Sequence, residues 1–287
     1  MNLKYILEHL SQAETATDNQ LTDRRDVLKG MGAKMLAAAL PLGIGTLFTN
    51  SASAQTVATV YQSLDFALQL EYLLYNYHHI GLNVGGLIPA NDQPGFQRVR
   101  AEQRAHINLL RLLIDTMGGT LYTPPSYPND ARTGDPYSPD SYDFTVNGKY
   151  SIYTSYPTYL EVAQALEDMS TRVYLGLIPN LLANTNGVMQ QMICFSTVEA
   201  RHAAFIRNIR RDIGAPETPK PWITNNIPPS IVLQPFYLGE DATSQRGIEL
   251  TQYDGNNGKL SKENVTEAFD EPMNMATAKA LMEPFFA

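Results

Sequence analysis

Two helical segments of this chain recur along the sequence, and the repeat limits the fold more than any other feature. In each copy a glutamate is followed, about a helix length later, by a glutamate or glutamine and then a histidine three positions on. The corresponding residues stand 96 positions apart and are Glu71 and Glu167, Gln103 and Glu199, and His106 and His202. A repeat of this kind predicts two copies of a two-helix unit packed against one another.

Residues that carry no chemistry follow the same shift. Stepping by four and three along the second helix of each copy gives Val99, Gln103, His106, Leu110, Leu113, Met117 and Phe195, Glu199, His202, Ile206, Ile209, Ile213. Apart from the polar positions already named, every residue on both seams is apolar. A stripe with this spacing faces the interior of a helical bundle. The polar side chains within it are therefore expected to be buried, where they need partners.

The polar residues on the seam have the chemistry of metal ligands. A carboxylate and an imidazole three residues apart lie on one face of a helix and can bind the same ion, as Glu199 and His202 do in this pattern. Glu167 supplies a third ligand from a neighbouring helix. Carboxylate and imidazole ligands fit iron or manganese better than copper or structural zinc.

With these motifs the chain resembles the ferritin-like domain family of exported bacterial proteins and desiccation-related proteins. The resemblance covers roughly residues 56–287 and rests on Leu70-Glu71-Tyr72, Leu166-Glu167, Glu199-Ala200-Arg201-His202 and Ala268-Phe269-Asp270-Glu271-Pro272. It implies an all-α, antiparallel four-helix bundle with a long crossover between the second and third helices, and a centre for two divalent metal ions, iron or manganese. The implied ligands are Glu71, His106, Glu167, Glu199 and His202. Glu71 and Glu167 are the expected bridging carboxylates.

Gln103 departs from the family pattern, because a neutral amide oxygen is a poorer ligand for a hard cation than a carboxylate. Glu102 next to it is the alternative ligand, and helical spacing alone allows either residue to face His106. Gln103 shares the apolar stripe, so we expect it to point inward and Glu102 to be solvated. A π-bulge in this helix would reverse the two. With Gln103 inward, the ion near Glu71 and His106 is expected to be weak or absent.

The helices of the bundle can be placed from periodicity and from glycine and proline. We expect the first from about Thr56 or Ser63 to Ile80 and the others at about 95–117, 157–183 and 188–213, with a Pro- and Tyr-rich crossover from 122 to 157. His78 and His79 are interpreted as residues near the end of the first helix and not as ligands. Beyond Gly214 the sequence predicts a Pro-rich extension that recovers helical character only at 261–269 and 273–282.

The first 54 residues resemble a twin-arginine export signal. Arg24 and Arg25 precede an apolar stretch from Met31 to Phe48, and Ala52-Ser53-Ala54 predicts cleavage between Ala54 and Gln55. The alternative is a transmembrane anchor, which Lys34 and several glycines disfavour. The domains predicted are therefore a signal at 1–54, the bundle at 55–216 and the extension at 217–287. The export machinery is the expected partner, and the protein is expected outside the cytoplasm without a stable membrane anchor.

The composition further limits the kinds of partner that can be expected. The formal net charge is −8, which argues against nucleic acid or an anionic membrane as a partner. Cys194 is the only cysteine, so no intramolecular disulfide can form, and we expect it to serve packing. An oligomer is compatible with the sequence.

Three functions fit these features. The first is oxidation of metal, or consumption of oxygen or peroxide, in stress protection. The second is a metal-free structural or stress-protective protein, in which Gln103 belongs to a polar network satisfied by hydrogen bonds. The third is a binding module that uses the crossover and the extension as its surface.

Overall fold

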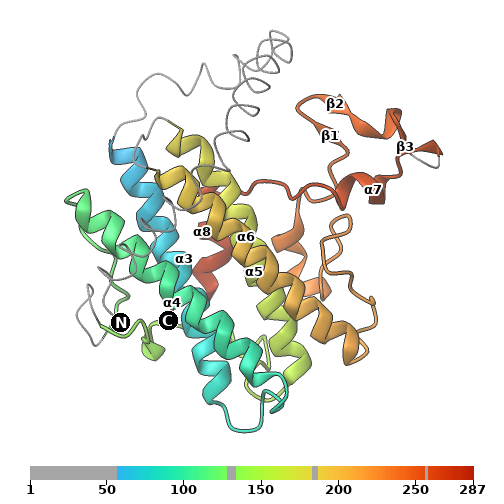
Figure 1. The fold of residues 1–287 in the computed structure, drawn as a ribbon. Coiled ribbons are helices and arrows are strands. Elements are labelled where there is room, and N and C mark those ends of the chain that lie inside the picture. Colours follow the sequence, from blue (N-terminus) through green and yellow to red (C-terminus); the bar gives the residue numbers. More distant parts are fainter. Residues whose placement is uncertain (1–56, 128–133, 183–186, 256–257) are drawn as a thin grey trace, which may run out of the picture. The chain divides into compact units, whose positions relative to one another are not determined.

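The computed structural model describes residues 57–127, 134–182, 187–255 and 258–287, with four long helices that pack together (Figure 1). These are α3 (Val57–Asn83), α4 (Gln93–Thr116), α5 (Tyr156–Leu181) and α6 (Val188–Asp212). Contacts are most extensive between α5 and α6, followed by α3 with α4 and α3 with α5. This confirms the predicted all-α bundle of two helix pairs joined by a long crossover. The predicted export signal lies outside the described residues.

The helices begin and end at residues whose chemistry favours those boundaries. Pro94 and Pro157 occupy the first turns of α4 and α5, where no intrahelical donor is lost. The Ser155 side chain caps α5 by accepting from the Thr158 backbone N–H at 3.3 Å. Gly214, with a φ of 81°, follows the end of α6 in the left-handed conformation that glycine adopts most easily. Within the described ranges, no helix combines the length and the apolarity needed to cross a bilayer.

The internal repeat is visible in the core. Counterpart residues of α3 and α5 are fully buried, namely Leu64 and Leu160, Ala67 and Ala163, and Leu70 and Leu166. The seam of α4 and α6 is buried through its central part, but Leu113 and Met117 are half-buried and Ile213 is exposed. Both seams are therefore buried in the middle of the bundle, at the level of the polar residues.

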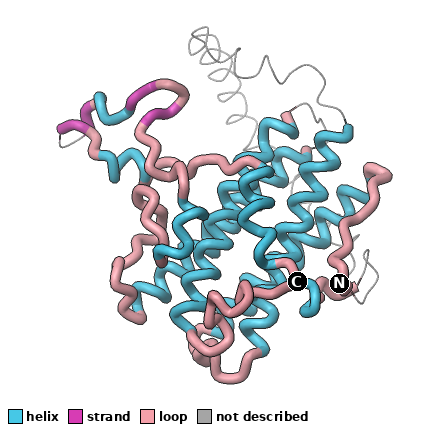
Figure 2. The backbone as a smooth tube through the Cα atoms, turned by 180° about the vertical axis from the view of Figure 1, so that it is seen from behind, coloured by secondary structure: helices cyan, strands magenta, loops and turns pink. Residues whose placement is uncertain are grey.

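Short elements lie in the crossover and the extension, and the part of the extension that carries the strands projects away from the four long helices (Figure 2). The short elements are η1 (Pro139–Ser141), η2 (Ile231–Tyr237), β1 (Ser244–Gln245), β2 (Ile248–Glu249), η3 (Leu250–Gln252), β3 (Asp254–Gly255), β4 (Gly258–Lys259), α7 (Lys262–Thr266), α8 (Met275–Met282) and η4 (Glu283–Phe285). Strands β1 and β2 pair antiparallel, as do β3 and β4. The chain end also meets the crossover, since Asp143 N donates to Phe285 O at 2.9 Å.

A buried arginine of α5 binds the extension at three backbone carbonyls. The Arg172 guanidinium donates to the carbonyls of Phe236 at 2.6 Å, Leu238 at 2.9 Å and Glu271 at 2.8 Å. One turn further along α5, Gly176 allows the extension to approach closely, because a Cβ there would lie 2.0 Å from the Met273 carbonyl oxygen. The segment after Gly214 is thus held against the helix that carries Glu167.

Candidate metal centre

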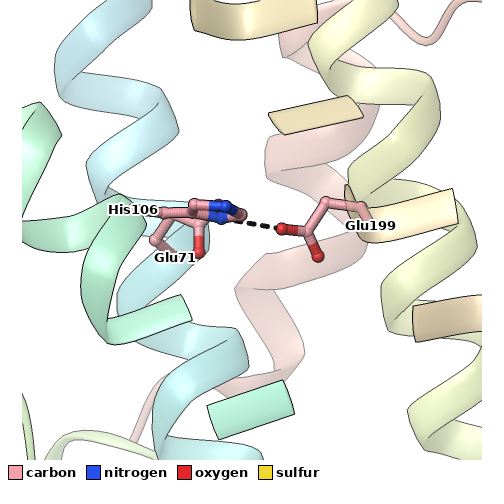
Figure 3. A group of neighbouring side chains, drawn as sticks. All are labelled: Glu71, His106 and Glu199. Carbon is pink, nitrogen blue, oxygen red and sulfur yellow. Dashed lines mark hydrogen bonds and ion pairs between the residues drawn. The ribbon is translucent and has the colours of Figure 1, made fainter. Parts of the chain in front are cut away.

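The first cluster of metal-ligating side chains joins three helices. Glu71 comes from α3, His106 from α4 and Glu199 from α6, and one ligand atom of each lies within 4.8 Å of the others. His106 Nδ1 is 3.2 Å from Glu71 Oε1 and 2.9 Å from Glu199 Oε1. Figure 3 shows Glu71 and His106 side by side, with Glu199 pointing toward them from the opposite helix. All three residues are buried.

The second cluster contains Glu167, Glu199 and His202, again with ligand atoms within 4.8 Å of one another. His202 Nδ1 lies 3.3 Å from Glu167 Oε2 and 3.2 Å from Glu199 Oε2. Glu199 therefore belongs to both clusters and turns one carboxylate oxygen toward each histidine. This differs from the expected arrangement, because the shared carboxylate is Glu199 and not Glu71 or Glu167.

Gln103 points inward, as the apolar seam predicted. Its side chain is fully buried, and its Nε2 donates to Glu167 Oε1 at 2.8 Å. The amide oxygen is buried and has no hydrogen-bond partner. Helix α4 is α-helical from Gln93 to Thr116 without a π turn, so the bulge that would have exchanged Gln103 and Glu102 does not occur.

The prediction that Glu102 is simply solvated is wrong. Its side chain is 30% exposed, and its Oε2 lies 2.8 Å from His202 Nε2, the nitrogen that faces away from the cluster. Its other oxygen accepts from Arg98 Nε at 2.9 Å. Glu102 thus holds the outer edge of the His202 ring, an arrangement that fixes the orientation and tautomer of metal-binding histidines.

His78 is a site residue that the sequence interpretation missed. It is fully buried five residues before the end of α3, with Nε2 at 2.7 Å from Glu167 Oε1 and Nδ1 at 2.9 Å from the Tyr159 hydroxyl. Tyr174 has a similar position beside the other glutamate, since its hydroxyl donates a short hydrogen bond to Glu71 Oε1. The only hint in the sequence is spacing: each residue stands seven positions after a glutamate of the repeat, on the same helix face.

Burial and mutual charge perturb the acids and bases of both clusters. Burial, together with the Glu199 charge, raises the pKa of Glu71 to about 7. Burial alone would lower the histidine values, but the neighbouring carboxylates outweigh it, raising the pKa of His106 to about 10 and that of His202 well above its usual range. The two histidines in turn outweigh burial at Glu199 and hold its pKa well below the usual range. Without an added cation, the imidazoles themselves supply the positive charge of the site.

The residues present fit a divalent cation. Glu71 Oε2 and Gln103 Oε1 are both buried without a hydrogen-bond partner, which is costly for polar oxygens unless a cation is nearby. The donor set of carboxylate oxygens and imidazole nitrogens suits iron or manganese. The clusters together contain three glutamates, one fewer than the ligand set of di-iron ferritin-like proteins, because Gln103 occupies the fourth position.

Cys194 lies outside the site. It is exposed on α6, so the prediction that it serves packing is wrong.

Comparison with known proteins gives one family. A family model described as a ferritin-like domain matches residues 59–212, which include all but the first two residues of the four long helices and every residue of both clusters. No curated protein matches the chain.

Proposed function

This chain belongs to the ferritin-like domain family, and on that premise we propose that it is an exported protein with a two-metal centre of iron or manganese. The centre oxidises ferrous ions or consumes oxygen or peroxide, as part of protection against stress. Glu71 and His106 would hold one ion and Glu167 and His202 the other, and Glu199 belongs to both groups of ligands.

One observation carries this proposal: two buried carboxylate and histidine clusters share Glu199 at the centre of the bundle. A structural core has no need of three glutamates and two histidines with their polar atoms turned toward one another, because burying such groups costs free energy. A pair of divalent ions would balance the carboxylates. It would also provide partners for the oxygens of Glu71 and Gln103 that have none among the protein atoms.

Bound iron or manganese would supply the one-electron oxidation steps and the site at which oxygen or peroxide reacts. The protein's own residues bind and orient. His106 and His202 face the site through Nδ1 and would have to release their protons to bind an ion, which would couple loading to proton release. Gln103 and His78 both direct hydrogen atoms at Glu167 Oε1 and thereby leave Oε2 facing His202. The apolar seams exclude bulk water.

Metal content and turnover test this proposal together. The full chain, isolated without chelators, is expected to contain iron or manganese and to accelerate ferrous oxidation by oxygen or peroxide. Glu199→Ala should lose most of both ions because Glu199 belongs to both clusters, while helix content remains. Asp212→Ala is the matched control, since this exposed acid ends the same helix away from the site. A wild-type protein without iron, manganese or zinc would refute the proposal.

The metal-free alternative also has an observation in its favour. Gln103, His78 and both cluster histidines already contact the carboxylates, and protonated His106 and His202 offset much of their charge. A structural or stress-protective protein of this kind would retain its full stability after exhaustive chelation. A metal-binding protein would instead gain stability when iron or manganese is added.

Export has its own test. Replacing both Arg24 and Arg25 with lysine should retain the protein in the cytoplasm, and the exported wild type should begin at Gln55. Normal export of the double variant, or a mature protein that begins at Met1, would contradict the twin-arginine interpretation.

A further inference from the structure

The internal repeat relates two residues that lie just outside the clusters. His78 follows Glu71 by seven positions, and Tyr174 follows Glu167 by seven, so the two are equivalent under the 96-residue shift. Each crosses the bundle to the glutamate of the other copy. His78 on α3 contacts Glu167 on α5, and Tyr174 on α5 contacts Glu71 on α3. The same position thus carries a ring nitrogen in one copy and a phenol in the other.

At Glu167 the two supporting contacts are on one oxygen, and the other oxygen faces the cluster. Oε1 lies 2.7 Å from His78 Nε2 and accepts from Gln103 Nε2 at 2.8 Å. Oε2 faces His202 Nδ1 at 3.3 Å. An ion bound by Oε2 would leave both supporting contacts in place. This half of the centre is therefore oriented in advance.

At Glu71 a single oxygen both accepts the supporting hydrogen bond and faces the histidine of the cluster. Oε1 accepts the short hydrogen bond from Tyr174 and also faces His106 Nδ1 at 3.2 Å. Oε2 is buried and has no hydrogen-bond partner. An ion that lies between Oε1 and His106 Nδ1 would therefore share Oε1 with the phenol, whose hydrogen bond withdraws negative charge from that oxygen.

From this difference we propose that Tyr174 and His78 are positioning residues that set the affinities of the two halves in opposite directions. Tyr174 weakens binding at Glu71 and His106, which makes that half the place where an ion exchanges. His78 strengthens binding at Glu167 and His202, which makes that half the place where an ion stays. The inference rests on the proposed function, and it assigns the ferrous substrate ion to the half beside Tyr174.

The test is calorimetric titration of the chelator-treated full chain with Mn²⁺, with free Mn²⁺ followed by electron paramagnetic resonance. The wild type is expected to show one strong and one weak binding event. Tyr174→Phe removes only the hydroxyl and should strengthen the weak event by about tenfold, the equivalent of one hydrogen bond to a charged group. The strong event should stay unchanged. Tyr72→Phe is the control, because this hydroxyl is also buried but bonds to Arg111.

The equivalent change at His78 should have the opposite sign. His78→Leu removes a donor to Glu167 and should weaken the strong event by roughly 10- to 100-fold, the usual effect of losing an outer partner of a metal ligand. His78→Gln offers an amide N–H close to the position of Nε2 and should restore most of the affinity. Rescue by glutamine would not be expected if His78 served packing alone.

The outcomes separate this inference from the function on which it rests. A wild type that binds no Mn²⁺ and also contains no iron or zinc on isolation would overturn both. Two events of equal affinity would overturn this inference alone. So would a Tyr174→Phe protein whose weak event is unchanged or weaker, or a His78→Leu protein whose weak event is the one affected.

Discussion

Replacing Gln103 with glutamate tests the geometry of the centre most directly. The substitution keeps the size of the side chain but removes the amide N–H that donates to Glu167, with 2.8 Å between Gln103 Nε2 and Glu167 Oε1. It also adds a fourth carboxyl group to a buried site that already contains Glu71, Glu167 and Glu199. The metal-free and metal-bound proteins should therefore respond in opposite directions.

The size of the effect follows from that distance. Two unit charges 2.8 Å apart repel by about 6 kcal/mol at an effective dielectric constant near 20. Protonating an ordinary glutamate at pH 7 costs only about 4 kcal/mol, so the new carboxyl group takes up a proton and donates to Glu167 as the amide did. Its pKa is higher in the folded than in the unfolded protein. The loss of stability is therefore absent near pH 4 and grows to about 4 kcal/mol at pH 7.

Thermal unfolding with and without Mn²⁺ measures both responses. At pH 7 the metal-free Gln103→Glu protein should melt roughly 10 °C below the wild type, which corresponds to about 4 kcal/mol for a domain of this size. Saturating Mn²⁺ should reverse the difference, and metal content should rise toward two ions per chain. Gln190→Glu, on the exposed side of α6, is the control. Equal melting temperatures at pH 7 together with unchanged metal content would refute the reasoning.

Further changes address the outer edge of the centre and the attachment of the extension. Glu102→Gln should weaken the ion near His202 by roughly 10- to 100-fold in a Mn²⁺ titration, because it removes the charge that holds the outer ring nitrogen; an unchanged affinity would restore the solvated interpretation. Gly176→Ala should lower the free energy of unfolding by about 1–3 kcal/mol in urea, since the new methyl group meets the Met273 carbonyl. Burial raises the pKa of Glu240 to about 8, so the wild type should lose stability as pH rises from about 5 to 8, by at most about 1.4 kcal/mol per unit. Glu240→Gln should lack this loss, and a parallel pH profile for the two proteins would contradict it.

The bundle and the inward positions could be predicted because the relevant information is local. Helical periodicity states which residues share a face, and the repeat states which faces are equivalent. Together they place Glu71, Glu199 and His202 inside the bundle, and they distinguish Gln103 from Glu102 without knowledge of any contact. The structure confirms that Glu71, Gln103, Glu199 and His202 are buried.

The outer partners could not be predicted because they depend on contacts between distant helices. His78 looked like a helix-end residue, but α3 continues to Asn83 and packs the ring against Glu167, 89 positions away. Glu102 is off the apolar seam of its own helix, yet it reaches His202 on α6, 100 positions away. Helical spacing shows which residues of one helix share a face. It does not show which residues of a neighbouring helix lie opposite that face.

The repeat also shows where the two copies differ. Apolar seam residues are replaced by other apolar residues, which keeps the core equivalent. At the centre the differences are chemical, and they fall at three pairs of equivalent positions: Gln103 and Glu199, His78 and Tyr174, and Glu102 and Val198. Two equivalent copies would give two ions the same surroundings, because every contact of one would have a counterpart at the other. The first pair changes a residue inside the centre, the second changes the group that hydrogen-bonds to a glutamate, and the third changes the outer partner of a histidine. The two halves of the centre therefore differ because of these side chains, even though the helices that carry them are equivalent.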